Sequence, residues 1–546
     1  MAELQIEQQT RDLIDALKAA CGSYGLGNSG NEYLIIIQIF LYKYMNDKFG
    51  YEAKRNRVYG KRLLAAKKWD VEYDTFTADE VEDLFSYLPA GTPRLRPEHT
   101  LAHLYNAQQK AGFADVLDAT LLDIANLNAS IFSIVTADKS TVTVFEAVTS
   151  YIKEKTKRDN FATALVTRIA QFNFEDTFEQ KYDFFSSIFE YLIKDYNTDG
   201  GGRYAEYYTP RAVATIMARL LVPDNADLHS VTCYDPSAGS GTLLMALAHQ
   251  IGEDRCQIYS QDISQKSSEM LRLNLILNNL VGSIQNVVMG NTLLSPQHKE
   301  KDGSLKRFDY IVSNPPFKLD FSDYSKTIEK DHLRFFAGVP GVPKKKKDDM
   351  AIYTCFLQHV LFSLAEKGKA AIVVPTGFLT AAKSIEKKIR ERIVNEGWLR
   401  GVVSMPSNIF ANTSTNVSVI FIDKDYNGKD AVFIDASKLG TEIRIDEKQR
   451  TVLSKEEIDY IVNTFHTCQD IDGFSAVRSK EQIIAKGYSF SAGQYFGVKL
   501  EHIEISQSEF DTEINKAKSS IQKMLEESKC LEEKIADCLN RIEINL

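Results

Sequence analysis

Two hydrophobic patterns divide the chain at about residue 165. Before that point, apolar residues recur at spacings of three and four, as at Leu13, Leu17 and Ala20, and the run 33–45 is almost continuously apolar. Both features predict packed α-helices. Beyond about residue 230, short apolar runs that end in turn-forming or polar residues alternate with helical stretches. That alternation is typical of βαβ units, so we predict a helical region followed by a doubly wound α/β domain.

The expected strands and helices of this domain follow from the same pattern. Strands are expected at residues 231–234, 257–263, 286–292, 308–312, 369–375, 400–405 and 416–422. Helices are expected at residues 266–280, 351–361 and 385–395, the second of them ending at Gly368. The run 416–422 is expected to lie antiparallel to the other strands, and the sheet to finish near Asp423.

A third pattern occupies the end of the chain. Apolar or small residues alternate there by three and four, flanked by Lys and Glu, at Ile514, Ala517, Ile521, Met524, Ser528, Leu531, Ile535, Cys538 and Ile542. Such a heptad seam predicts a coiled-coil helix that needs a partner. The partner can be a second copy, the body of the same chain or another protein.

Composition narrows the class of protein. Hydrophobic residues make up 44% and charged residues 25% of the 546 residues, as in ordinary globular proteins. The apolar stretch 33–42 is too short to cross a bilayer, so no membrane association is expected. Seven cysteines without a C-x-x-C pair indicate neither a disulfide framework nor a metal site, which fits a reducing cytoplasm. With a net charge of −9, binding to DNA would need local basic patches or a basic partner.

The sequence Asn314-Pro315-Pro316-Phe317 closes the apolar run 308–312. Proline cannot donate to a sheet ladder and biases the preceding residue away from helix, which predicts a stiff turn at a strand end. The Asn314 side-chain oxygen and the Pro315 carbonyl can accept the two hydrogens of a planar NH2 group, while Phe317 stacks on its face. An ordinary proline-rich loop is the alternative. The motif resembles the catalytic Asn-Pro-Pro-Phe of methyltransferases acting on adenine N6, which implies catalytic roles for all four residues.

A glycine-rich loop follows the first strand. Residues 235–241 read Asp-Pro-Ser-Ala-Gly-Ser-Gly and open into a helix. Glycines let the backbone turn sharply and approach a ligand at the carboxyl end of a parallel sheet. No Gly-Lys-Ser/Thr follows, which argues against a Walker loop. Beside the Asn-Pro-Pro-Phe motif, the resemblance to these methyltransferases implies that the loop binds S-adenosyl-L-methionine through Asp235, Ser237, Gly239, Ser240 and Gly241.

Two further polar residues end the next strands. A carboxylate at Asp262 can accept both ribose hydroxyls of an adenosyl cofactor. Asn291 would meet the cofactor's adenine; the family usually has Asp there, but an amide can also pair with an adenine edge. Because the carboxyl ends of parallel strands form one crevice, the glycine-rich loop, Asp262, Asn291 and Asn314 are expected to share one site.

Upstream of the first strand, residues 206–211 read Glu-Tyr-Tyr-Thr-Pro-Arg. Thr209 can cap a helix with Pro210 in its first turn, and a well-capped helix is the simple interpretation. The segment also resembles the part of these methyltransferases that binds the methionine end of the cofactor. The resemblance implies cofactor contacts at Glu206, Tyr207, Tyr208, Thr209, Pro210 and Arg211.

A long loop, 317–350, separates the Asn-Pro-Pro-Phe motif from the next helix. Loops of this length in compact domains are usually functional or mobile. It can close over a flipped-out base, with Lys344–Lys347 touching phosphate, or these lysines can be an ordinary solvated charge run.

From about residue 195 to 497 the chain resembles the modification subunits of type I restriction-modification systems, including residues 487–490 and Tyr495. The resemblance implies a class I methyltransferase sheet at 166–480, preceded by an all-α domain at 1–165 and followed by a helical tail at 481–546. It implies site-specific N6 methylation of a flipped-out adenine. The implied partners are DNA, a DNA-specificity subunit that packs on the tail, a second modification subunit and, as an open question, an ATP-dependent restriction subunit.

Domain size also favours a separate specificity chain. A self-sufficient enzyme would need a target-recognition domain of about 100–200 residues, and little room remains between Asp423 and the tail. Three other functions stay open: methylation of glutamine in translation release factors, methylation of guanine amino groups in RNA, and a cofactor-binding scaffold without activity. The first typically has Tyr in place of Phe317, and neither of the first two accounts for the coiled-coil pattern.

Overall fold

The computed structural model describes residues 2–27, 30–135, 141–142, 144–175, 178, 209–224, 226–382, 385–410, 416–427, 429–445, 448–496 and 506–540. The chain divides into two compact units, Met1–Phe496 and Gly497–Leu546, which we describe separately. No helix within the described residues combines the length and apolar character that crossing a membrane requires.

The amino-terminal part of the first unit is helical, as expected. Side chains such as Tyr33, Ile36 and Phe40 are fully buried and form its core. Local signals also set helix ends, as where a capping box joins Thr77 and Glu80 at the start of the helix that follows them. The helices are α1 (Ala2–Ser23), α2 (Gly30–Arg55), α3 (Gly60–Ala65), α4 (Trp69–Tyr73), α5 (Ala78–Tyr87), η1 (Pro97–His99), α6 (Leu101–Ala107), α7 (Phe113–Leu127), α8 (Ala129–Phe132), η2 (Val148–Tyr151) and α9 (Lys155–Ile169).

This helical part packs directly against the α/β part. The Tyr44 hydroxyl lies 3.4 Å from the carbonyl oxygens of both Ile276 and Leu277, and donates to them. A short ribbon of β1 (Ile134–Val135) and β2 (Thr141–Val142) lies near the same edge and contacts the strand 287–289. The sequence did not predict this ribbon, because two-residue strands are too short to show a period.

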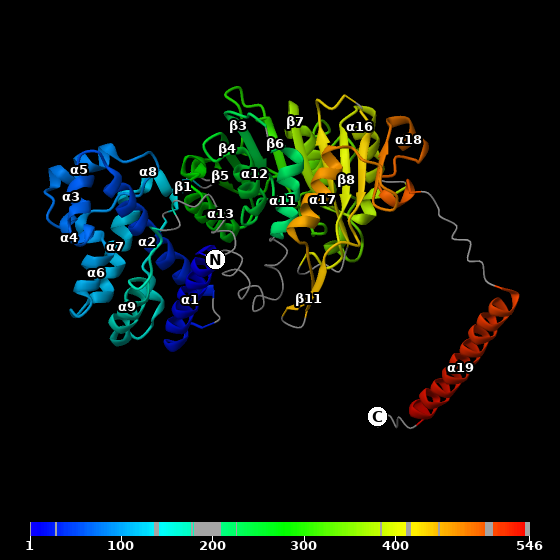
Figure 1. Ribbon diagram of the computed structural model, residues 1–546, viewed down its shortest axis with the longest axis horizontal. Coiled ribbons are helices and arrows are strands. Elements are labelled where there is room, and N and C mark those ends of the chain that lie inside the picture. The colour runs from blue at the N-terminus through cyan, green and yellow to red at the C-terminus, as the bar shows by residue number, and fades with distance from the viewer. Residues whose placement is uncertain are drawn as a thin grey trace. The chain divides into compact units, whose positions relative to one another are not determined.

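The α/β part is built on one large sheet (Figure 1). Its strands are β3 (Val231–Asp235), β4 (Cys256–Asp262), β5 (Val287–Met289), β6 (Phe308–Ser313), β7 (Leu364–Pro375), β8 (Leu399–Ser404), β9 (Val417–Asp423), β10 (Ala431–Asp435) and β13 (Ser475–Arg478). Among the described residues they pair in the order β13-β10-β8-β9-β7-β6-β3-β4-β5. β9 is antiparallel to both β7 and β8, and β13 is antiparallel to β10.

The order of the strands positions a ligand site. From β3 the chain continues to β4 and β5 on one side, whereas β6 and β7 pair on the other side. In a doubly wound sheet, such a reversal opens a crevice at the carboxyl ends of the strands. The order, with β9 reversed between β7 and β8, confirms the expected class I methyltransferase sheet.

Helices cover both faces of the sheet. Alternate residues of β7 show this, because Ala371 and Val373 enter one hydrophobic core while Ala370 and Ile372 enter the other. The surrounding helices are α11 (Arg211–Leu221), α12 (Thr242–Ile251), α13 (Gln265–Leu277), η5 (Val281–Asn286), α14 (Ser325–Glu329), η6 (Lys347–Asp349), α15 (Tyr353–Ser363), η7 (Thr376–Leu379), α16 (Ile385–Asn395), α17 (Lys455–His466), α18 (Lys480–Ala485) and η8 (Ala492–Gln494).

The expected end of the sheet near Asp423 is wrong. Two more strands follow, since β10 pairs parallel with β8 and β13 closes the edge. A separate ribbon of β11 (Thr441–Ile445) and β12 (Lys448–Val452) precedes α17. The runs that form β10 and β13 are only 5 and 4 residues long, so their pairing depends on tertiary neighbours more than on period.

Two local predictions also need correction. Gly368 does not end a helix: α15 stops at Ser363, and Gly368 lies within β7. A Cβ atom there would stand 2.8 Å from the carbonyl oxygen of Phe308, so the glycine permits close strand pairing. The third strand is shorter than expected, because its run 286–292 forms only β5, and Gly290 and Asn291 turn away after it.

Residues 486–496 belong to the first unit and are held by a buried arginine. Arg390 is 1% exposed, and its guanidinium donates to the carbonyl oxygens of Phe378, Ala381 and Tyr488. A backbone hydrogen bond from Phe490 to the Leu379 carbonyl runs beside this cluster. A fully paired arginine of this kind fixes the segment after α18 against the loop that follows β7.

The second unit contains one long helix, α19 (Gln507–Asn540). It confirms a helical tail, and the apolar residues of its predicted seam are exposed: Ile514, Ile521, Met524, Leu531 and Ile535 are 38–62% accessible. Ile542 of the predicted seam lies outside the described residues. An isolated helix with such a stripe gains little stability from propensity alone, which is consistent with the predicted need for a partner.

Replacing Gly401 tests the packing between β8 and α17. A Cβ atom at Gly401 would overlap the Val432 carbonyl and stand 2.6 Å from the Phe465 ring, so we expect Gly401→Ala to lower the free energy of unfolding by about 1–3 kcal/mol. Gly282→Ala is the control, because nothing lies within 4 Å of its added methyl group. Thermal denaturation measures the melting temperature of both variants. Equal melting temperatures would contradict the described packing.

Candidate functional site

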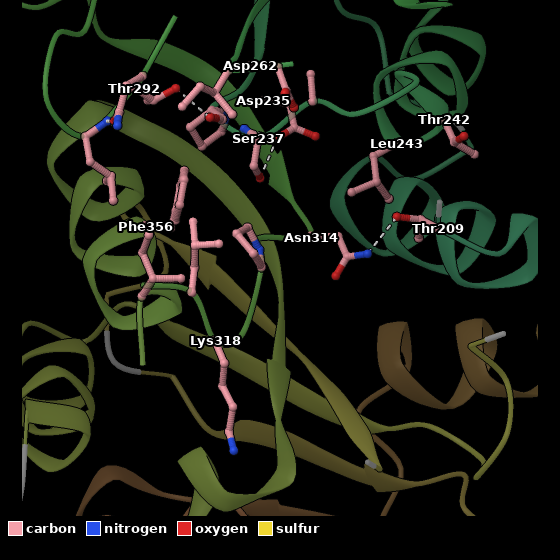
Figure 2. A pocket seen from close by; sticks show the side chains of 18 of the residues that line it. Thr209, Asp235, Ser237, Thr242, Leu243, Asp262, Thr292, Asn314, Lys318 and Phe356 are labelled. Atoms are coloured by element: carbon pink, nitrogen blue, oxygen red, sulfur yellow. Dashed lines mark hydrogen bonds between the residues drawn. The ribbon is translucent and has the colours of Figure 1, made fainter. Parts of the chain in front are cut away.

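A pocket opens at the carboxyl ends of β3, β4, β5 and β6 (Figure 2). It brings together residues that the sequence places up to 147 positions apart, from Thr209 to Phe356. The predicted site residues that line it are Thr209, Asp235, Ser237, Asp262, Asn291, Asn314 and Pro316. Pro210, Arg211, Gly239, Ser240, Gly241, Pro315 and Phe317 are described but do not line it. Glu206, Tyr207 and Tyr208 lie outside the described residues.

The glycine-rich loop forms the wall between β3 and α12. Ser237 donates its backbone N–H to the Asp235 carboxylate at 2.9 Å, which closes the first turn. Gly241 has φ of +85° at the start of α12, and a side chain there would overlap Leu271. The positive φ and the close approach both require glycine. The glycine therefore lets the end of the loop pack closely against α13.

Asp262 ties the end of β4 to this loop. One carboxylate oxygen accepts from the Gly239 N–H at 2.9 Å, and the other accepts from the Ser264 N–H at 2.8 Å. Each oxygen keeps a second lone pair for a ligand hydroxyl. Burial raises the pKa of Asp262, against the effect of both backbone hydrogen bonds. The carboxylate is thus oriented before any ligand binds.

Asp235 is the second buried acid of the pocket. Burial raises its pKa to about 8, and the charge of Asp262 adds to this effect, whereas the hydrogen bonds from Ser237 oppose it. Neither carboxylate forms an ion pair with a Lys, Arg or His among the described residues. Two buried acids without a protein cation favour a ligand that carries positive charge and hydroxyl donors.

Asn291 lines the pocket, but its polar atoms are largely engaged by the protein. Its side-chain oxygen accepts from the backbone N–H groups of Leu293 and Leu294, both at 3.1 Å. An interaction with the Asn291 side chain lowers the pKa of the Tyr324 hydroxyl, against the larger effect of burial, which raises it. Contact with an adenine ring stays a prediction, and the structure adds a local role, in which Asn291 holds the turn after β5.

Asn314 extends from the turn after β6 into the pocket, and its amide nitrogen donates to the Thr209 hydroxyl at 3.0 Å (Figure 2). Pro315 is buried in the stiff turn behind it. The Phe317 ring is partly buried and packs edge-on against Tyr353, with centroids 6.2 Å apart. Stacking of Phe317 on a substrate base therefore stays a prediction.

The interpretation of Thr209 as a helix cap is wrong. α11 begins at Arg211, its N-cap is Pro210, and no side chain caps it. The Thr209 hydroxyl instead meets Asn314, from a residue 105 positions away in the sequence. Local capping patterns cannot reveal such a tertiary contact.

Sequence reasoning missed several residues that shape the pocket. Asn274 is buried in α13 and donates to the Ser240 carbonyl at 2.8 Å, which anchors the glycine-rich loop. The Thr292 hydroxyl donates to the Pro236 carbonyl at 2.7 Å. Asn274 is a polar residue between leucines, and that is the signal that could have identified it, whereas no local pattern marks Thr292.

The segment 318–352 also contributes to the pocket. It is folded around a small core of its own, in which Phe321, Ile328 and Phe335 pack on Ile352 and Phe356 of the pocket wall. Arg334 is buried and donates to the Leu293 carbonyl at 2.5 Å. The segment therefore has a fixed place beside the pocket, and its function remains a proposal.

S-adenosyl-L-methionine fits this donor set. Asp235 and Asp262 offer negative charge and hydroxyl acceptors, and Leu243, Phe356 and Ile263 offer apolar surface for a base. Ile263 is 64% exposed despite its apolar side chain, which is expected of a residue that a ligand covers. Fold and pocket together define a class I S-adenosylmethionine-dependent methyltransferase.

Comparisons with known proteins agree with this class. Residues 180–503 match the family described as N-6 DNA Methylase. The match covers more than half of the chain, and the chain belongs to this family. Membership confirms the expected adenine-specific DNA methyltransferase activity and S-adenosyl-L-methionine as cofactor.

Two curated relatives share this region. The type I restriction enzyme MpnII methylase subunit of Mycoplasma pneumoniae is 26% identical over 388 residues, 70% of this chain and 68% of that protein. The MjaIX methylase subunit of Methanocaldococcus jannaschii is 28% identical over 394 residues, 69% of this chain and 66% of that protein. The alignments thus span about two thirds of each relative.

A solved structure confirms the fold. The methyltransferase subunit of a type I restriction-modification system from Streptococcus thermophilus superposes with a TM-score of 0.70 at 23% identity. The superposition covers 90% of this chain and 99% of that chain. A modification subunit of a type I restriction enzyme from Vibrio vulnificus YJ016 has a TM-score of 0.52 at 16% identity over 87% of this chain and 93% of that chain.

The raised pKa of Asp235 predicts pH-dependent cofactor binding. Because the cofactor is cationic, it prefers the ionised carboxylate, so binding between pH 5.5 and 7.5 should release a proton and tighten up to about tenfold per pH unit. The cofactor's own amino group stays protonated over most of this range, since α-amino pKa values lie near 7.7–8.0. Calorimetric titration in buffers of different ionisation enthalpy measures both quantities.

The control for this prediction removes the titrating group. Asp235→Asn should bind more weakly at pH 7.5 and lose most of the pH dependence, while Asp302→Asn, in an exposed loop, should behave as the unmodified chain. Equal slopes for Asp235→Asn and the unmodified chain would show that another group titrates.

Proposed function

We propose that this chain is the modification subunit of a type I restriction-modification complex, and that it methylates N6 of a flipped-out adenine at sites chosen by a separate specificity subunit. One observation carries the proposal: the Asn314 amide and the buried acids Asp235 and Asp262 open into the same pocket. The curated relatives, both methylase subunits of type I restriction enzymes, support the same role.

The chemistry assigned to Asn314 follows from the target amine. The exocyclic nitrogen of adenine is a poor nucleophile because its lone pair is delocalised into the ring. The Asn314 side-chain oxygen and the Pro315 carbonyl would accept its two hydrogens and favour a pyramidal nitrogen. When bound, S-adenosyl-L-methionine supplies an electrophilic methyl group. Catalysis by this chain would then consist of positioning and electrostatics.

An adenine inside a duplex cannot reach this pocket, so base flipping is part of the proposal. Lys318 lines the pocket and is exposed at the start of segment 318–352. Lys344–Lys347 belong to the same segment, and Lys347 lies 3.2 Å from the Ser322 hydroxyl. Phosphate contacts from these lysines would supply part of the DNA affinity that the net charge of −9 does not.

The exposed helix α19 is the feature from which we propose the partners of this chain. The exposed apolar seam of α19 suits the helical spacer of a DNA-specificity subunit, and a second modification subunit would occupy the other half-site. An ATP-dependent restriction subunit is a further proposed partner, and the cytoplasm is the proposed location.

The rival functions receive less support. The family match to N-6 DNA methylases favours DNA over a release factor or an RNA guanine. A scaffold without activity has no need for an amide held in the pocket by Thr209. The two rival methyltransferases are distinguished by their substrates, tRNA and a release factor, and the scaffold by the absence of any methyl transfer.

Transfer of a labelled methyl group to DNA tests the proposal. The chain together with its specificity subunit should produce N6-methyladenine, while the chain alone, or tRNA or a release factor as substrate, should give background. Asn314→Ala should lower the rate by at least about a thousandfold, because both acceptor and geometry are lost, without weakening cofactor binding. Robust site-specific transfer by the chain alone, or normal turnover by Asn314→Ala, would overturn the proposal.

Charge placed on the seam of α19 tests the partner. Ile521→Glu with Leu531→Glu puts two carboxylates into the predicted interface, so co-purification with the specificity subunit and methylation should both be lost. The matched control, Ser519→Glu with Gln522→Glu, adds the same charge to the opposite side of the helix. Retained assembly of the seam variant would show that the tail binds elsewhere.

A further inference from the structure

The hydrogen bond between Asn314 and Thr209 joins the turn after β6 to the segment that leads into α11 (Figure 2). Thr209 is 5% exposed, and it directly precedes Pro210, which restricts its backbone. The helix that follows, α11, packs against α12 and α17. The segment that carries the Thr209 hydroxyl is therefore held in place by packing, and the Asn314 amide donates a hydrogen bond to this hydroxyl.

An asparagine amide has two ends of similar shape and opposite hydrogen-bonding character. With its nitrogen donating to Thr209, Asn314 leaves its oxygen for the pocket. The opposite orientation would point N–H donors at the N–H donors of a target amine. Only the orientation with nitrogen toward Thr209 lets a target amine, the Asn314 amide and the Thr209 hydroxyl form a continuous chain of donors and acceptors.

We infer that Thr209 is a positioning residue, which acts through Asn314 by holding its amide with the oxygen directed at the target amine. The inference rests on the proposed function and adds a residue that would otherwise count only as a cofactor contact. A hydrogen bond donated by the amide nitrogen also polarises the amide and strengthens its oxygen as an acceptor. Thr209 would thus fix the orientation of the Asn314 amide and strengthen the Asn314 oxygen as a hydrogen-bond acceptor.

The loop around Asn314 supports this role. Ser313, the residue before it, lies with its hydroxyl 2.8 Å from that of Ser237, so the backbone next to Asn314 is also held. With the backbone fixed on one side, rotation of the side chain is the remaining freedom of Asn314. The Thr209 hydroxyl is the hydrogen-bond partner found for its side chain among the described residues.

The test compares Thr209→Val with Thr209→Ser under single-turnover conditions with saturating cofactor. Val keeps the shape but removes the acceptor, so the methyl-transfer rate constant should fall about tenfold or more, and Ser should restore most of it. The dissociation constant for the cofactor and the fluorescence of 2-aminopurine at the target position should stay unchanged. Thr163→Val, a remote and half-buried site, controls for loss of a hydroxyl.

The outcomes separate the two proposals. Weaker cofactor binding by Thr209→Val, with an unchanged rate at saturation, would make Thr209 a cofactor ligand and overturn the inference. If the unmodified complex transfers no methyl group to DNA, the proposed function fails, and a thermal-unfolding cycle of Thr209→Val with Asn314→Ala decides the inference instead. Coupled effects on the melting temperature would support the contact, and strictly additive effects would overturn it.

Discussion

The reversal of strand order at β3 is the constraint on which the rest of the molecule depends. Because β4 and β6 pair on opposite sides of β3, the loops that leave these strands must diverge, and a crevice opens between them. The hydrogen bond from the Gly239 N–H to Asp262 closes one wall of this crevice, and the contact between Ser237 and Ser313 closes the other. The remaining elements keep these two walls in place.

The pocket combines two buried acids, which favour a cationic cofactor, with an amide that is already oriented by the protein. Asp235 and Asp262 are costly to bury without a cation, which favours occupancy by a charged cofactor. Asn314 is weak as a general base but effective as an oriented acceptor. In the proposed mechanism, the enzyme accelerates transfer by holding its reactants in place, without a strong base.

The two units of the chain carry different features of the structure. The first unit carries the sheet, the pocket and the buried Arg390 that fixes the segment after α18. The second carries, within its described residues 506–540, the helix α19, in which the seam residues Ile514, Ile521, Met524, Leu531 and Ile535 are exposed. With a net charge of −9, DNA binding would need local basic patches or a basic partner, and the exposed seam of α19 is the proposed place for that partner.

The sequence alone determined the parallel strands, the order of polar residues at their ends, the Asn-Pro-Pro-Phe turn and the helical tail, because each depends on local period or on the fixed geometry of proline and glycine. Tertiary structure decided what local pattern does not encode. It placed β10 and β13 at the edge of the sheet, set Gly368 inside β7, and turned Thr209 from an expected helix cap into the partner of Asn314. These features depend on contacts between residues far apart in the chain, whose strength only the folded packing supplies.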